Sequence, residues 1–184
     1  MTKDATYEGE REVKTFVDLF HGSKVLLDKS KSQQEGSYFT TMGSLLLTAF
    51  TFEAFLNHLG HKKIKFWNEI DRISINSKYT VLCEEFEIKP DYSKKPYQTI
   101  KQLFRFRNSI AHGRSEVLNV NKKVSSEDDP WQHEPKTDWE EFCTEINADK
   151  TREDVGKIIK ELNEAAGLGD YPFISGMTIS SISI

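Results

Sequence analysis

The sequence of 184 residues contains only two cysteines, Cys83 and Cys143, and no Cys-x-x-Cys pair. This excludes a disulfide framework and offers no zinc-ligand spacing, so a reducing compartment fits best. The first residues lack the apolar core of a secretion signal, and no apolar run approaches the length that crosses a bilayer. We therefore expect a cytoplasmic protein with no membrane partner.

Two common catalytic signatures are also missing, a Gly-rich phosphate loop and a Gly-x-Ser-x-Gly nucleophile elbow. His58 and His61 lie close together in the sequence, but no carboxylate or cysteine stands at ligand spacing from them. We therefore expect neither a metal nor another cofactor.

Charge is nearly balanced overall, with 25 basic and 29 acidic side chains, but it is unevenly distributed. Residues 89–114 hold seven basic residues against the single acid Asp91, whereas residues 127–170 hold fourteen acids and five bases. The basic stretch either binds phosphate or is a solvated face, and the two stretches can meet within one chain or across a subunit boundary. Composition alone argues neither for nucleic acid nor for disorder.

Apolar residues recur at helical spacing in five segments, so the fold is expected to be mainly α. A hydrophobic content of 37% suits one domain, placed at residues 1–170 and followed by an uncharged, Ile- and Ser-rich tail at residues 171–184. The predicted helices are residues 8–29, 38–59, 77–86, 96–112 and a last one that starts at a cap formed by Thr151 and Asp154 and ends at Gly167. Gly60 is expected to end the second helix and Gly113 to follow the fourth.

Segments outside these helices give weaker signals. Residues 116–124 alternate loosely, which predicts a small hairpin after the fourth helix, followed by a polar loop at residues 125–135. The tail is either frayed or docked as an edge strand on this chain or on a partner. Three tryptophans either fill or cover the core or stack on bases: Trp67, Trp131 and Trp139.

The end of the fourth predicted helix carries the main functional signal. Arg107 falls in the middle of the apolar stripe of that helix, among Ile100, Leu103 and Phe104. Because burying an unpaired guanidinium is costly, Arg107 needs an acid partner, a bound anion or an opening to water at a subunit boundary. His112 stands in the last turn, where the negative end of the helix dipole favours imidazolium and suits proton transfer.

Helix geometry limits how these side chains can combine. Asn108 and His112 share one flank of the helix, whereas Arg107 and His112 diverge by about 140° of arc. One chain cannot easily aim both at one atom, but two copies around a two-fold axis can. Arg107 suits a phosphate in fork geometry, and Asn108 can bind the phosphate or orient the imidazole. Further phosphate-binding candidates on the basic stretch are Lys101, Arg105 and Arg114.

The run Arg-Asn-Ser-Ile-Ala-His at residues 107–112 resembles the motif of the HEPN domains, in which Arg and His are separated by four to six residues and a polar residue follows the Arg. The earlier hydrophobic run Phe-Glu-Ala-Phe-Leu-Asn, residues 52–57, is similar to the family's core helix, so the resemblance covers about residues 38–114. It implies an HEPN-like bundle of four to five helices, with the hairpin and loop added after the motif helix.

HEPN proteins are commonly homodimers with their motifs facing each other across the interface, and many are metal-independent endoribonucleases. The resemblance implies that this chain is such a homodimeric ribonuclease acting on RNA, as a toxin or phage-defence component for which an antitoxin protein is a candidate partner. The catalytic residues would be Arg107, Asn108 and His112. A ribose 2′-hydroxyl would attack the adjacent phosphate with His112 as acid or base and leave a cyclic phosphate, while Arg107 stabilises the transition state.

Two residues of the earlier helix, Glu53 and Asn57, are supporting candidates on one face. Glu53 is expected to be half buried, and it either pairs with Arg107 or orients His112, or else forms a purely structural ion pair. Other HEPN members bind nucleotides or proteins without cleaving them, so a non-catalytic binding module is the alternative function. A third reading is a structural protein in which Arg107 makes an internal ion pair and His112 caps its helix.

Overall fold

The computed structural model describes residues 4–183, and this part of the chain is mainly helical, as predicted. Its elements, in chain order, are β1 (Thr6–Arg11), α1 (Thr15–Ser32), α2 (Ser37–Lys63), α3 (Trp67–Ile70), α4 (Ile75–Glu85), α5 (Tyr97–Ala111), the 3₁₀ helix η1 (Pro130–His133), α6 (Asp138–Phe142), α7 (Glu145–Ala165) and β2 (Thr178–Ser183). The five predicted helices correspond to α1, α2, α4, α5 and α7. The short helices α3, η1 and α6 and the strand β1 were not predicted, whereas β2 lies in the tail, for which an edge strand was one of the alternatives.

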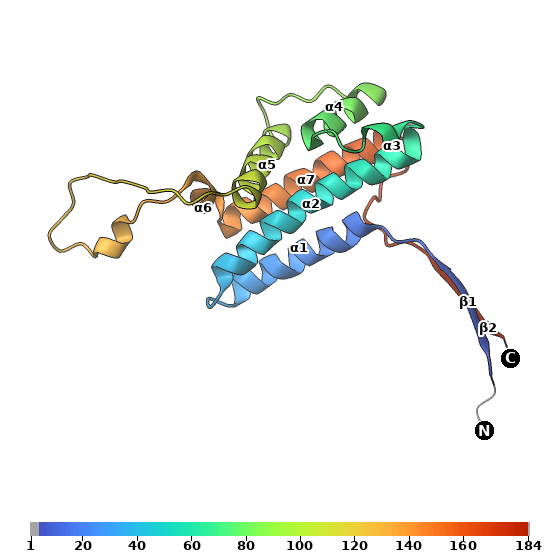
Figure 1. The fold of residues 1–184 in the computed structure, drawn as a ribbon, viewed down its shortest axis with the longest axis horizontal. Helices are drawn as coiled ribbons and strands as arrows, with labels where there is room; N and C mark the ends of the chain where they lie inside the picture. The colour runs from blue at the N-terminus through green and yellow to red at the C-terminus, as the bar shows by residue number, and fades with distance from the viewer. Residues whose placement is uncertain (1–3, 184) are drawn as a thin grey trace.

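Helix α2 is the centre of the bundle, with α1 and α7 beside it and α4 and α5 packed on it (Figure 1). Its apolar residues cover most of its circumference, and several of them have no exposed surface: Leu45, Ala49, Phe52, Phe55, Leu56 and Leu59. A helix that is apolar on nearly every side is stable only when other helices surround it. The sequence prediction of a central second helix is confirmed.

Gly60 lies inside α2, so the prediction that it ends the helix was wrong. A Cβ at this position would lie 2.1 Å from Cδ2 of Trp67, whose indole is 1% exposed. Glycine is therefore needed for the close approach of Trp67 to the helix backbone, and not for a helix end.

Helix α2 is also long and apolar enough to cross a membrane, which was not expected of any segment. This follows from its length and composition, because one window of 18 residues is strongly apolar. Half of that window is buried inside the bundle, and the core helix of a bundle can have the same length and apolar composition as a membrane-spanning helix. The expectation that no apolar run approaches this length was therefore wrong.

The first helix begins at Thr15, because residues 6–11 form a strand instead of the predicted helical start. Strand β1 pairs antiparallel with β2, from Thr6 opposite Ser183 to Arg11 opposite Thr178. The tail thus docks as an edge strand on this same chain, one of the two placements left open. The ribbon projects away from the bundle (Figure 1), and all of its residues are exposed.

Helix α7 starts at Glu145 and is capped by Thr144, whose hydroxyl accepts a hydrogen bond from the backbone N–H of Asn147. The predicted cap at Thr151 and Asp154 was wrong, because both residues are buried inside α7. Asp154 there accepts a hydrogen bond from the Thr99 hydroxyl of α5. This bond satisfies both buried side chains and links α7 to α5. Gly167 follows the helix with φ +70°, as a left-handed terminator should.

The predicted hairpin at residues 116–124 was also wrong, since this segment contains neither helix nor strand. Its alternating apolar residues have no surface to cover, and Val117 is 85% exposed. The segment belongs to a loop that extends from the bundle between α5 and α6 (Figure 1). An alternating pattern predicts a strand only where one face can be buried.

Candidate functional site

Helix α5 carries the site, and its bounds agree closely with the predicted residues 96–112. Pro96 precedes its first turn and Gly113 follows its C-cap residue, His112. The helix buries Ile100, Leu103, Phe104 and Phe106 against the bundle. This burial fixes the rotation of the helix and therefore the direction of every polar side chain on it.

Arg107 lies on the buried side of α5, and its side chain is 24% exposed. Its Nη2 is 3.6 Å from Oε2 of Glu53 on α2, and its Nη1 donates a 3.0 Å hydrogen bond to Oδ1 of Asn108. Its Cζ lies 5.9 Å from the ring centroid of Phe50. Of the three predicted ways to accommodate Arg107, the structure shows an acid partner within one chain, and Glu53 is half buried as expected.

One donor of Arg107 is left over. Its Nε is buried and has no hydrogen-bond partner, and the 3.6 Å separation from Glu53 is longer than a tight charge-assisted hydrogen bond. A buried N–H without an acceptor is unfavourable, so the site would gain from an additional acceptor. Anions with several oxygen atoms supply such acceptors.

Arg107 opens into a cavity of about 250 Å³ between α2, α5 and the start of α4, which we call the motif cavity. Its lining comprises Glu53, Ile73, Ser74, Ile75, Asn76, Phe104, Arg107 and Asn108. The contribution of residues 73–76 was not predicted, because residues 73 and 74 lie in the connection after α3 and α4 begins at Ile75, two residues before its predicted start. Ser74 caps α4 by accepting a hydrogen bond from the Ser77 N–H.

His112 lies on a different side of α5. Its backbone N–H donates a 2.9 Å hydrogen bond to the carbonyl of Asn108, and its exposed side chain lines a second hollow of about 530 Å³, which we call the histidine hollow. Arg105, Arg114, Lys136 and Asp138 also line this hollow. Arg107 and His112 therefore line separate spaces within one chain, as their divergence along the helix predicted.

The remaining predicted site residues have different surroundings. Asn57 accepts a 2.8 Å hydrogen bond from Nζ of the buried Lys78 and so provides an acceptor for this buried donor. It does not line the motif cavity. Lys101 is exposed on α5. Arg105 forms an ion pair with Asp138 of α6, so the basic and acidic stretches do meet within one chain.

Sequence reasoning missed the whole contribution of α6 to this side of α5. Thr137 and Glu140 form a capping box at its start, in which the Thr137 N–H donates to Glu140 and the Glu140 N–H donates to Thr137. The spacing Thr-x-x-Glu is readable in the sequence and could have located this helix. Asp138 and Lys136 would then have joined the candidate residues, beside Trp139.

The described residues offer neither a metal-binding cluster nor a reactive cysteine. Among residues 4–183, no group of three His, Cys, Asp or Glu side chains could hold a metal ion. Burial raises the pKa of the Cys83 thiol and that of the Cys143 thiol to about 11, so both are protonated at neutral pH and are poor nucleophiles. His58 packs against the ring of Phe16, with 5.0 Å between the ring centroids.

No protein-family model, no curated protein and no solved structure matches this chain. The likeness to HEPN domains therefore rests on the residues of the motif and on their placement at the end of a packed helix.

Proposed function

We propose that this protein is a homodimeric, metal-independent endoribonuclease with an HEPN-like helical core. The observation that supports it most is the state of Arg107, which is largely buried, lies beside Asn108, lines the motif cavity and has a buried Nε without a hydrogen-bond partner. An arginine held in this way suits the binding of a phosphate oxygen. His112 follows little more than one helical turn later, exposed at the open end of the same helix.

The proposed reaction breaks a phosphodiester bond without a metal ion. One His112 imidazole accepts the proton of a ribose 2′-hydroxyl, whose oxygen then forms a bond to the adjacent phosphorus. The bond from phosphorus to the 5′-oxygen breaks, and that oxygen leaves with a proton from an imidazolium or water. The products are a 2′,3′-cyclic phosphate and a 5′-hydroxyl. Arg107 opposes the charge that develops on the phosphoryl oxygens.

The separate placement of Arg107 and His112 makes dimerisation part of the proposal. Because the two side chains line different spaces in one chain, a complete site takes Arg107 and Asn108 from one protomer and His112 from its partner. A two-fold axis near the end of α5 would create two such sites. Lys101, Arg105 and Arg114 on or just after α5 would then attract the RNA backbone.

We further propose that the protein acts on RNA in the cytoplasm, as a toxin or phage-defence component. An antitoxin protein that covers the end of α5 would block the reaction. A metal is not required, because the imidazole and the guanidinium provide proton transfer and charge stabilisation.

The experiment is cleavage of a mixed RNA substrate by the purified protein in excess EDTA. The unmodified protein should cut, and His112→Ala should lower the rate at least about 100-fold, because it removes the proton-transferring group. His61→Ala, an exposed histidine of α2, is the matched control and should cut normally. Equal cleavage by the His112→Ala protein would refute the role of His112.

A second candidate function is favoured by one observation. Glu53 lies against Arg107 and offsets part of its charge, as it would in a module that binds a nucleotide or a protein segment without cleaving RNA. That function predicts thermal stabilisation by RNA with no turnover, and loss of this stabilisation in Arg107→Ala.

A further inference from the structure

We propose that the cavity between α5 and α6 binds the guanine base of the RNA, beside the phosphate held near His112. The inference rests on the proposed ribonuclease function and adds a base preference to it. The cavity has a volume of about 330 Å³, within the range of small-molecule sites, and we call it the α5–α6 cavity.

The α5–α6 cavity adjoins the histidine hollow directly. The two spaces share four lining residues, Arg105, Ser109, Asp138 and Trp139, so they form one groove along α5. A nucleotide needs such a pair of neighbouring spaces, one for its phosphate and one for its base. The groove runs from Gln102 in the α5–α6 cavity to His112 in the histidine hollow.

The charges differ along this groove. The histidine hollow has three cationic side chains, Arg105, Arg114 and Lys136, against the carboxylates of Glu116 and Asp138. The α5–α6 cavity has Arg105 alone against Asp138 and Glu141. An anionic phosphate is therefore favoured at the His112 end, whereas the other end disfavours an anion and suits a neutral group rich in N–H donors.

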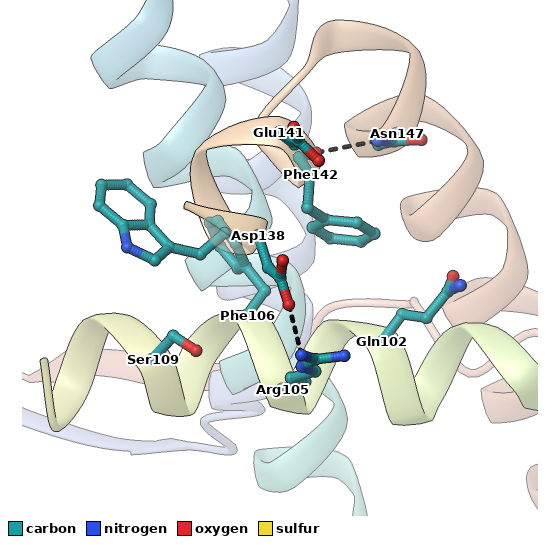
Figure 2. A pocket seen from close by; sticks show the side chains of 9 residues that line it. Gln102, Arg105, Phe106, Ser109, Asp138, Glu141, Phe142 and Asn147 are labelled. Carbon is teal, nitrogen blue, oxygen red and sulfur yellow. Dashed lines mark hydrogen bonds and ion pairs between the residues drawn. The ribbon is translucent and has the colours of Figure 1, made fainter. Parts of the chain in front are cut away.

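The lining of the α5–α6 cavity contains aromatic side chains from both helices. Figure 2 shows Gln102, Arg105 and Ser109 on α5 facing α6, with Asp138 directed at Arg105. The rings of Phe106 and Phe142 meet at 5.5 Å between centroids. Trp139 adds a third aromatic side chain to the lining. Aromatic side chains provide the stacking surface that an unpaired base needs.

The polar groups favour guanine over the other bases. Guanine is the one standard base that presents two adjacent donors, N1–H and N2–H, on its Watson–Crick edge, and a carboxylate accepts both. Glu141 is exposed at the cavity and forms no ion pair or side-chain hydrogen bond among the described residues, so its carboxylate is free to do this. Arginine is the usual donor to O6 and N7 of guanine, and Arg105 stands in the same lining.

The test is calorimetric titration of the unmodified protein, in EDTA, with each of the four ribonucleoside monophosphates and with inorganic phosphate. We expect the Kd for guanosine monophosphate to be at least about tenfold lower than that for uridine monophosphate. Glu141→Gln should remove most of this difference, because it removes the carboxylate that accepts both guanine donors. Glu127→Gln, on the exposed loop, is the matched control and should retain the preference.

A second pair of variants tests stacking. Trp139→Ala should weaken binding of every nucleotide at least about fivefold, whereas Trp131→Ala, whose side chain is 80% exposed outside the cavity, should have no effect. Equal affinity for all four nucleotides, or an unchanged preference in Glu141→Gln, would overturn the base site even if the protein cuts RNA. A guanine preference without RNA cleavage would support the base site and refute only the ribonuclease.

Discussion

The two sides of α5 each carry an arginine, and the surroundings of the two guanidinium groups differ. On the bundle side, Arg107 is held by Glu53 and Asn108 and retains one unsatisfied donor. On the solvent side, Arg105 meets Asp138 with about three quarters of both side chains exposed. The same residue type is thus largely buried in one place and largely exposed to water in the other.

The difference indicates separate tasks for the two sides. A guanidinium held in one geometry with little water around it can stabilise a transition state without reorganising. An exposed guanidinium is screened by water and salt, so Arg105 contributes to substrate binding, through the phosphate backbone and the proposed guanine base, more than to the chemical step.

The largest contrast is expected in the kinetics of RNA cleavage. Arg107→Ala should lower kcat by about 10²–10³, because the transition state loses a preorganised donor. Arg105→Ala should raise KM less than about tenfold with little change in kcat, because it removes ground-state attraction. Arg11→Ala, on the exposed ribbon, should change neither constant. Steady-state assays in EDTA measure all three, and similar kcat losses at positions 105 and 107 would remove the distinction.

The next contrast is in stability. Glu53→Ala should lower the free energy of unfolding by about 1–3 kcal/mol, because it leaves the largely buried Arg107 without its acid. Asp138→Ala removes the exposed partner of Arg105 and should cost less than about 0.5 kcal/mol. Urea unfolding monitored by circular dichroism gives both values. Adding Arg107→Leu to Glu53→Ala should recover part of the loss; a further loss would show that the charge was not the cause.

The smallest effect concerns the pH dependence of stability. Burial, with help from Lys62 and Lys14, lowers the pKa of His58 below its usual value of about 6.5. The folded protein therefore binds the proton less readily than the unfolded chain. The contribution of His58 to the free energy of unfolding is fully present above pH 6.5 and is lost as the pH falls through the lowered pKa. Melting temperatures should decline more gently between pH 7 and pH 5 in His58→Gln; an identical decline would exclude this contribution.

Local patterns predicted much of the bundle and of the motif cavity. The apolar stripe of α5 placed Arg107 on the buried side, and the acid partner, one of three predicted ways to accommodate its charge, is Glu53. The approximate bounds of α2, α4 and α5 followed from helical periodicity. The helix bounds depend on residues close together in the sequence, and the Arg107–Glu53 pair depends on the cost of leaving a buried charge alone.

The features that were missed depend on distant residues. The β1–β2 ribbon pairs Thr6 with Ser183, and neither strand has a buried face that would mark it. Gly60 resembled a helix end because the contact with Trp67 is tertiary. The cavity between α5 and α6 brings Arg105 to Asp138 across a loop without any periodic pattern. Only the capping box at the start of α6 was a readable local signal.

The most direct test of the account is complementation between two inactive variants. Mixed and reassembled Arg107→Ala and His112→Ala proteins should form heterodimers in which one site has both native residues, contributed by different protomers. Random assortment then predicts recovery of about one quarter of the unmodified RNA cleavage rate in EDTA. Recovery to that level would confirm a site shared between two copies of α5. No recovery, with heterodimers demonstrated in the same sample, would contradict it.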